Sequence, residues 1–206
     1  MSRKKKASGI TRHEILDVAW ELISRDGAGI SMQDIADAVG VSRQSVYLHF
    51  KSRGGLLMEL VRHADEKFAI KRHFSKAMAV PEPAKRLDAC LIAWFQFAQK
   101  IRPVATDLIR LRKTDEDAAR AWEDRMRDLR AWERKLVESL AAEAALAGEW
   151  SVSDATDYLW SASAIQAYDL LVGDRGWSHA KCARVLRFTI AGALLAQQSG
   201  EGRRAP

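Results

Sequence analysis

The sequence predicts an all-α protein in which a small helix-turn-helix domain precedes a larger helical domain. Apolar residues recur at steps of three and four along most of the 206 residues, and no segment alternates apolar and polar residues as a half-buried strand does. Hydrophobic residues make up 48% of the chain and charged residues 29%, which is typical of a globular protein with a sizeable core. About nine helices are expected.

A basic arm, residues 1–9, is expected to precede the first helix. The next segment, residues 10–55, is predicted to hold three short helices. Thr11 is the predicted N-cap of the first of them, with Glu14 at its third position, and the helix ends near Arg25.

The second and third helices are predicted to be joined by a glycine turn. Ser31 opens the second helix as a cap, and Gly40 stops it because glycine adopts the left-handed conformation most readily. Ser42 is the predicted cap of the third helix, in which Val46 and Phe50 face inward one turn apart.

A longer helix over about residues 52–76 is expected to link this domain to a second one, residues 56–206. The other expected helices run approximately over residues 83–100, 103–112, 114–148, 153–172 and 178–198. Pro83 and Pro103 favour helix starts, because proline is tolerated in the first turn.

The sequence argues against disulfides and a membrane span. Cys90 and Cys182 lie far apart and form no Cys-x-x-Cys pair, so a reducing compartment is expected. The apolar runs are much shorter than the roughly 20 residues that a membrane helix needs. The basic start is not followed by the apolar stretch of a signal peptide, so we expect a cytoplasmic protein without membrane partners.

No enzyme motif is found. The chain has no nucleophile elbow, no phosphate-binding glycine loop and no His-Glu-x-x-His. Glu59 and His63 are spaced to share a metal, but no third ligand is near in sequence, which favours a surface pair. We therefore expect no catalytic residue, no metal and no cofactor, although a site assembled from distant residues stays open.

The third predicted helix carries residues suited to reading DNA. The net charge of +6 invites a nucleic-acid partner, and the outer face of this helix offers Arg43, Gln44, Tyr47 and His49. Arginine can bind guanine edges and glutamine adenine edges, while hydroxyl and basic side chains suit phosphates. The alternative is an ordinary helical hairpin with a solvated polar face.

The identities and the spacing of residues in the N-terminal part of the chain also resemble those of a known family. The residues that carry it are Thr11-Arg12-His13-Glu14-Ile15-Leu16-Asp17-Val18-Ala19, Ile35-Ala36, Gly40-Val41-Ser42, Val46-Tyr47-Leu48-His49-Phe50 and Leu56-Leu57. This pattern resembles the N-terminal domain of the tetracycline-repressor (TetR) family of bacterial transcriptional regulators and covers about residues 10–60. The resemblance implies that the third helix enters the major groove, that Tyr47 contacts a phosphate, and that Arg53, opening the fourth helix, does likewise.

We expect the DNA-binding residues to be Thr11, Ser31, Ser42, Arg43, Gln44, Ser45, Tyr47, His49, Lys51 and Arg53. Contacts from Lys4 to Lys6 in the arm are a further option beside a solvated tail. The family usually has Lys then Glu where this chain has Arg53 and Gly54, so the charge survives but the first turn of the fourth helix is expected to be looser.

The resemblance implies that the larger domain holds an effector pocket. Six of the seven tryptophans lie beyond residue 90, which favours an apolar or aromatic ligand, although aromatics at helical spacing also make plain core. The candidate ligand residues are Trp94, Phe97, Arg110, Trp122, Met126 and Trp160.

The resemblance also implies a homodimer formed through the last two helices. The candidate interface residues are Leu159, Ala162, Gln166, Val185, Thr189 and Gly192. Small residues among them allow close helix packing. The alternative is that these faces pack only within one subunit.

The predicted function is that of a ligand-responsive, sequence-specific regulator of transcription, most simply a repressor released by a small molecule. Its partners would be a double-stranded DNA operator with an inverted repeat, an apolar or aromatic effector and a second copy of the chain. A non-specific architectural DNA binder and a helical enzyme with an incidental helix-turn-helix are the alternatives.

Overall fold

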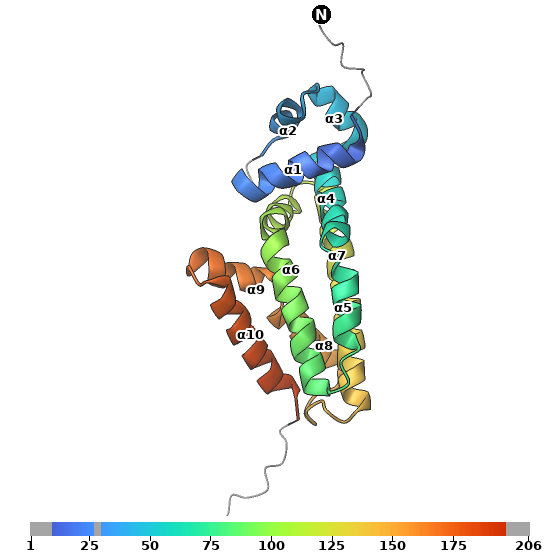
Figure 1. The fold of residues 1–206 in the computed structure, drawn as a ribbon, viewed down its shortest axis with the longest axis vertical. Coiled ribbons are helices and arrows are strands. Elements are labelled where there is room, and N and C mark those ends of the chain that lie inside the picture. Colours follow the sequence, from blue (N-terminus) through green and yellow to red (C-terminus); the bar gives the residue numbers. More distant parts are fainter. Residues whose placement is uncertain (1–9, 27–29, 197–206) are drawn as a thin grey trace, which may run out of the picture. The chain divides into compact units, whose positions relative to one another are not determined.

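A computed structural model describes residues 10–26 and 30–196, and these residues form the expected all-α fold (Figure 1). The helices are α1 (Arg12–Asp26), α2 (Met32–Val39), α3 (Arg43–Phe50), α4 (Arg53–Lys67), α5 (Ile70–Met78), α6 (Pro83–Leu111), α7 (Glu116–Ala142), α8 (Val152–Ala162), α9 (Ile165–Asp169), the π-helical segment η1 (Leu170–Asp174) and α10 (His179–Leu194). Within the described ranges, extended pairing is limited to an isolated bridge between Leu146 and Leu195. None of the described helices is both long and apolar enough to cross a membrane.

The chain divides into two compact units, each built from two stretches of sequence. Unit 1 comprises the described residues within 1–64 and 103–122, and unit 2 comprises the described residues within 65–102 and 123–206. This division differs from the single boundary predicted after residue 55, because most of α4, the end of α6 and the start of α7 belong with the N-terminal helices. Each of these three helices has one part in unit 1 and the other part in unit 2.

The N-terminal helices start and stop at the predicted capping residues. The Glu14 amide donates to Thr11 Oγ1 at 3.2 Å, and the Thr11 amide donates to Glu14 Oε2 at 2.8 Å, which is a reciprocal capping box. Ser31 and Asp34 form the same box at α2. Gly40 ends α2 with a φ of 78°, in the left-handed region, as expected.

The helix expected over residues 52–76 is in fact two helices. α4 ends at Lys67, and α5 starts at Ile70 after Ala69 adopts a left-handed conformation with a φ of 48°. The turn redirects the chain so that Ile70 and Ala77 are buried on α5. The prediction was wrong because neither glycine nor proline marks this turn, and burial of the new face determines it.

The break expected at Pro103 is absent, because α6 continues through this residue. Proline removes one backbone donor and disfavours the preceding helical turn. Val104 and Leu108, which follow it, are fully buried. Packing of these apolar side chains outweighs the local preference of proline, and the two predicted helices are one.

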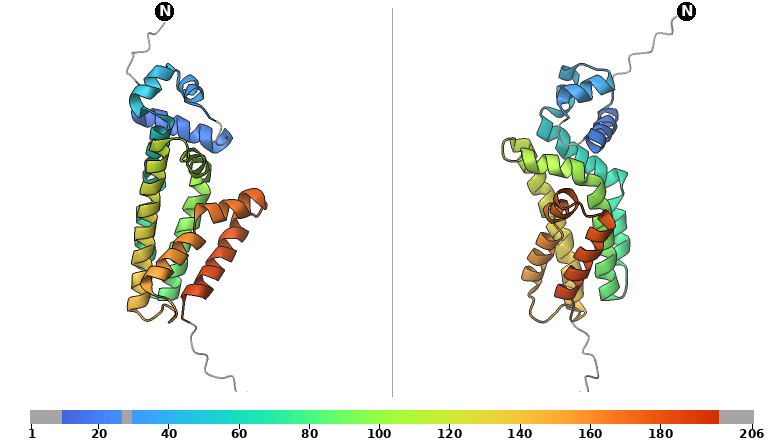
Figure 2. Two further views of the ribbon diagram at one scale, coloured as in Figure 1. Left: turned by 180° about the vertical axis from the view of Figure 1, so that it is seen from behind. Right: turned by 90° about the vertical axis from the view of Figure 1, so that its left-hand side faces the viewer.

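The C-terminal helices are shorter than predicted. α7 ends at Ala142 and not near Gly148. The expected helix over residues 153–172 is divided into α8, α9 and η1, with the first break at Ser163, whose carbonyl accepts a hydrogen bond from Trp94 Nε1 at 2.8 Å. Within unit 2, α10 packs against α8 and η1 (Figure 2).

Unit 1 requires glycine at the start of α4. A Cβ added to Gly54 would lie 2.3 Å from Asp115 Oδ1 and 2.4 Å from the backbone nitrogen of Ala118. A Cβ on Gly55 would lie 2.4 Å from the Phe50 carbonyl oxygen. The looser first turn expected from Gly54 is thus wrong, because glycine here permits close packing of α4 against the start of α7.

We predict that Gly54→Ala destabilises the protein, because the added Cβ meets the backbone nitrogen of Ala118, which cannot rotate away. The free energy of unfolding should fall by roughly 1–3 kcal/mol, measured by urea denaturation followed by circular dichroism. Gly148→Ala is the control, since nothing lies within 4 Å of its Cβ. Equal stability of wild type and Gly54→Ala would contradict the close approach.

Candidate nucleic-acid interface and ligand pocket

α2 and α3 form a helix-turn-helix held together by apolar side chains. Ser42 caps α3, since the Ser45 amide donates to Ser42 Oγ at 3.1 Å. Ala36 on α2 and Val46 on α3 are fully buried, and Phe50 is nearly so. Because the inward face of α3 is used for packing, its other face is left for a partner.

The outward face of α3 presents two polar side chains and one apolar side chain. Arg43 and Gln44 are exposed, as predicted. Arg43 Nη2 donates to Tyr47 Oη at 3.2 Å, and the guanidinium carbon lies 5.3 Å from the Tyr47 ring centroid, so the two side chains orient one another. Leu48 is 80% exposed, and the sequence analysis did not name it as a candidate DNA-binding residue. An exposed apolar side chain on this face is suited to contact with a thymine methyl group.

Hydroxyl groups among the predicted DNA-binding residues shape the helix starts. Thr11 Oγ1 bonds to Glu14, and Ser31 Oγ accepts the first-turn amide of α2. Ser42 Oγ lies 2.8 Å from Ser45 Oγ and also caps α3. Their role toward DNA stays a prediction, and their structural role is to fix the N-termini of α1 to α3.

The end of α3 carries His49 and Lys51. The His49 ring is half-buried, with its centroid 6.0 Å from that of Phe50. Lys51 is exposed and has a φ of 59°, where the chain turns from α3 toward α4. Lys51 therefore places a solvent-exposed positive charge immediately after the last residue of α3.

Arg53 is half-buried in unit 1, where an ion pair engages its guanidinium, and its contact with a phosphate stays a prediction. Its guanidinium pairs with Asp107, whose carboxylate is 0% exposed, and its own side chain is 20% exposed. Arg110 Nη2 donates to the other oxygen of Asp107 at 2.9 Å. Ser52 Oγ donates to Asp117 on α7. Arg53 thus ties α4 to α6, and Arg110 belongs to the same cluster and not to the ligand pocket of unit 2.

Unit 2 contains a mostly apolar pocket lined by α5, α6, α7 and the C-terminal part of α8. Its volume is about 380 Å³, counting space open to solvent. The lining residues are Phe74, Met78, Cys90, Leu91, Trp94, Leu129, Trp132, Glu133, Leu136, Leu159 and Ser163. Trp94 is thus a predicted ligand residue that lines a pocket.

The other predicted ligand residues do not line this pocket. Trp122, like Arg110, belongs to unit 1, and Phe97 is a buried core residue of unit 2. Met126 and Trp160 are half-buried, and the indole nitrogen of Trp160 has no hydrogen-bond partner among the described residues. Helical spacing identified apolar residues but could not separate pocket walls from core.

Glu133 is a polar pocket residue that the sequence analysis missed. Its Oε1 accepts a hydrogen bond from Ser163 Oγ at 2.6 Å, whereas its buried Oε2 has no partner in the described part of the chain. Burial raises the pKa of this carboxyl group from 4.5 to about 8, against the lowering effects of the Ser163 hydrogen bond and the Arg130 charge. A glutamate within the apolar stripe of α7, beside Trp132, was the available signal.

The predicted dimer residues are divided between interior and surface. Leu159 is fully buried and lines the pocket, so it cannot meet a partner, and its assignment was wrong. Thr189 and Gly192 on α10 are exposed, and the half-buried members are Ala162, Gln166 and Val185. The sequence analysis missed Phe188, which is 78% exposed, and Leu170, which is 59% exposed.

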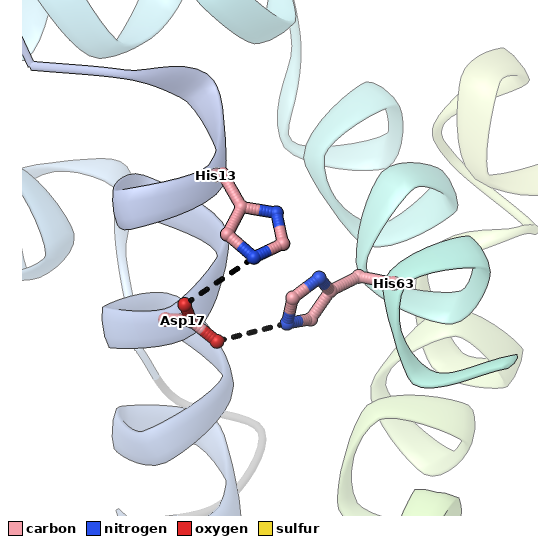
Figure 3. A group of neighbouring side chains, drawn as sticks. All are labelled: His13, Asp17 and His63. Atoms are coloured by element: carbon pink, nitrogen blue, oxygen red, sulfur yellow. Dashed lines mark hydrogen bonds and ion pairs between the residues drawn. The ribbon is translucent and has the colours of Figure 1, made fainter. Parts of the chain in front are cut away.

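His13, Asp17 and His63 meet within unit 1 and link α1 to α4 (Figure 3). His63 Nε2 lies 3.0 Å from Asp17 Oδ1, and His13 Nε2 lies 3.7 Å from Asp17 Oδ2. Two imidazoles and one carboxylate are acceptable zinc ligands, so these residues could hold a metal. The surface pair predicted for Glu59 and His63 is wrong, because His63 is buried and its ring lies against Asp17 on another helix. The Asp17–His63 hydrogen bond itself explains why they lie together.

Comparison with known proteins finds a family match in the N-terminal part of the chain. Residues 15–60, from α1 into α4, match the family described as "Bacterial regulatory proteins, tetR family". This part of the chain is also similar to curated transcriptional regulators of bacteria.

Two curated relatives and one solved structure define the extent of the likeness. The HTH-type transcriptional regulator AcrR of Shigella flexneri is 44% identical over 62 residues, which are 29% of this chain and 29% of AcrR. The probable acrEF/envCD operon repressor of Escherichia coli (strain K12) is 28% identical over 104 residues, 49% of this chain and 47% of the repressor. The chain thus spans less than half the length of these curated relatives in the matched regions.

A transcriptional regulator from Saccharomonospora viridis, solved in complex with choline, has the same fold. It matches 90% of this chain and 98% of its own length with a TM-score of 0.72 and 18% sequence identity. At this identity the likeness concerns the fold alone.

We predict that Glu133 makes the stability of the protein fall as the pH rises. Its folded pKa of about 8 lies above the ordinary 4.5, so the folded state holds the extra proton between these values. This contribution is complete below about pH 4.5 and is lost as the pH rises through about 8. Relative to Glu133→Gln, the free energy of unfolding should fall by up to about 1.4 kcal/mol per pH unit in this window, measured by urea denaturation. Parallel pH profiles for the two proteins would refute the raised pKa.

Proposed function

We propose that the protein is a cytoplasmic, homodimeric repressor that binds an inverted-repeat operator and is released from it by a small molecule. The observation that carries the proposal is the exposed outer face of α3, on a capped helix-turn-helix whose inner face is packed. The E. coli relative, which is named as an operon repressor, supports repression over activation.

In this proposal α3 reads bases with three side chains. The Arg43 guanidinium would donate two hydrogen bonds to a guanine, and Gln44 would pair with an adenine. Leu48 would contact a thymine methyl group, because its exposed branched side chain has no polar atom to satisfy. The contact between Tyr47 and Arg43 supports this reading, since it holds the guanidinium on the outer face before DNA arrives.

The backbone of the DNA would be bound around this reading face. Tyr47 Oη accepts from Arg43, so its own proton remains available for a phosphate oxygen. Lys51 would add an exposed positive charge, and the hydroxyl residues and His49 would contribute from the helix ends. The basic arm, residues 1–9, lies outside the described residues, and its contact with DNA is part of the proposal.

The second copy of the chain would bind through α10 and its neighbour η1. Phe188 and Leu170 are large apolar side chains left exposed in unit 2, which is unfavourable unless a partner covers them. Thr189 and Gly192 extend the exposed surface of α10. A twofold contact would supply the two copies of α3 that an inverted repeat requires.

Release by a ligand would act through helices that belong to both units. α6 and α7 supply pocket walls in unit 2, and their other ends bind the first turn of α4 through Asp107 and Asp117 in unit 1. A ligand that favours a different position of α6 or α7 would therefore change the geometry at the start of α4, directly after α3.

Selection of bound sequences from a random DNA pool at about 0.15 M salt tests the DNA-binding part. We expect an enriched inverted repeat. On that operator, Arg43→Ala should weaken binding by roughly 1–3 kcal/mol, because a bidentate base contact is lost. Arg62→Ala is the matched control, since Arg62 is exposed on α4 and its Nη1 lies 3.3 Å from Glu59 Oε1.

A pool without enrichment would refute sequence-specific binding and favour the architectural alternative if the protein still retained DNA. Equal operator affinity for Arg43→Ala and wild type would refute the reading face assigned to α3.

Dimerisation through α10 predicts a monomer when Phe188 is replaced by a charge. Phe188→Glu should raise the dimer dissociation constant at least about 100-fold, because a twofold contact buries the side chain twice and each buried Phe contributes roughly 1.5–3 kcal/mol. Analytical ultracentrifugation gives the oligomeric state. Leu48→Glu, at a residue of similar exposure on α3, should remain dimeric and lose DNA binding. A dimeric Phe188→Glu protein would place the interface elsewhere.

A further inference from the structure

Glu133 is the acidic group among the described residues that line the pocket of unit 2. Glu133 lines the pocket with 8% of its surface exposed, and its Oε2 is buried and unpartnered among the described residues. A buried polar atom without a partner is unfavourable, because it has lost water and gained nothing in exchange. The pocket is therefore complementary to a ligand that supplies what Oε2 lacks.

The surroundings of Glu133 favour a positive charge as the missing partner. None of the described lining residues is Lys, Arg or His. Cys90 is neutral at physiological pH, since burial raises the pKa of its thiol to about 11. Arg130 acts on Glu133 from one turn away on α7, but its guanidinium is bound to Asp157 on α8 at 2.7 Å. The positive charge must come from the ligand.

The walls are also suited to an apolar cation. Trp94 on α6 and Trp132 on α7 line the pocket, and the Phe74 ring is stacked on Trp132 with centroids 5.4 Å apart. Aromatic faces attract cations, and Lys135 Nζ already lies 5.4 Å from the Trp132 ring centroid. Rings of this kind also exclude strongly hydrated ions, which would not give up their water for an apolar wall.

Two hydrogen bonds that both involve Ser163 fix the Glu133 carboxyl group in place. Trp94 Nε1 donates to the Ser163 carbonyl at 2.8 Å, and Ser163 Oγ donates to Glu133 Oε1 at 2.6 Å. These hydrogen bonds orient one oxygen and leave the other for the ligand. Such an arrangement positions Glu133 before any ligand binds, so little ordering is needed on binding.

We infer that the pocket selects an apolar organic cation, an amine or a quaternary ammonium compound, whose charge is balanced by Glu133 and whose body packs on Trp94 and Trp132. The inference deepens the proposed function. The role of the cation as the effector that releases DNA rests on that function, whereas binding of the cation to the pocket does not. Binding itself is measured without DNA, so failure of the cation test and failure of the operator test are separate results.

Binding is coupled to loss of a proton from Glu133. The free pocket holds a largely protonated carboxyl group at neutral pH, and a cation favours the carboxylate. The affinity for a permanent cation therefore rises with pH until the carboxyl is ionised without it. The groups that face Glu133 are Arg130 on α7, Ser163 at the end of α8 and the neutral Cys90 on α6, while α5 contributes apolar side chains.

The test uses phenyltrimethylammonium and tert-butylbenzene, which share a shape and differ by one positive charge. Tryptophan fluorescence of the full chain, with two tryptophans in the pocket wall, reports binding of both. At about pH 9 we expect the cation to bind at least about tenfold more tightly than the neutral compound. At about pH 6 cation binding should weaken at least about tenfold, and binding of the neutral compound should not change.

Glu133→Gln keeps the size and polarity of the side chain and removes its charge. We expect this variant to bind tert-butylbenzene as wild type does and to lose both the preference for the cation and its pH dependence. Glu138→Gln, an exposed carboxylate on the same helix, is the matched control and should behave as wild type. Retained cation preference in Glu133→Gln, equal affinities of the two compounds for wild type, or no binding of the cation would each overturn the inference.

Discussion

The buried carboxylate of Asp107 is the constraint on which unit 1 depends. It has no exposed surface, and it pairs with Arg53 at the start of α4 and with Arg110 one turn later on α6. A buried charge is tolerated only when it is paired, since an uncompensated one is destabilising by several kcal/mol. Asp107 therefore fixes where α4 begins, and with it the turn that follows α3. The close packing at Gly54 and the Ser52–Asp117 hydrogen bond serve the same junction.

This junction explains why a DNA-binding unit recruits parts of α6 and α7. A helix-turn-helix of three short helices has a small core, and small cores bury too little apolar surface for high stability. The ends of α6 and α7 enlarge that core with Val104, Leu108 and Ala118, all fully buried. The same two helices line the pocket of unit 2, so the pocket walls and the partners of the first turn of α4 belong to the same elements.

Local sequence was sufficient where one side chain or one backbone conformation decides the outcome. Thr11, Ser31 and Ser42 cap the helices that they were predicted to cap, and Gly40 takes the left-handed turn. Local preference failed at Ala69, which turns the chain without glycine, and at Pro103, which does not end a helix. In both places burial of apolar side chains further along the chain outweighs the preference of the single residue. The candidate site shows the same difference between local and distant determinants. The outer face of α3 was predictable from the spacing of its residues, whereas the pairing of Arg53 with Asp107 was not, because it joins residues far apart in the sequence.

The sequence by itself determined the helical class, the caps of α1 to α3, the exposed outer face of α3 with Arg43 and Gln44, and the likeness of residues 15–60 to bacterial regulators of the TetR family. Only the tertiary structure decided which apolar residues wall the pocket, that Glu133 Oε2 is buried there without a partner among the described residues, and that Phe188 faces solvent. The reason is physical. Capping and helical periodicity act over three or four residues, whereas desolvation, ion pairing and pocket formation depend on side chains brought together from distant helices.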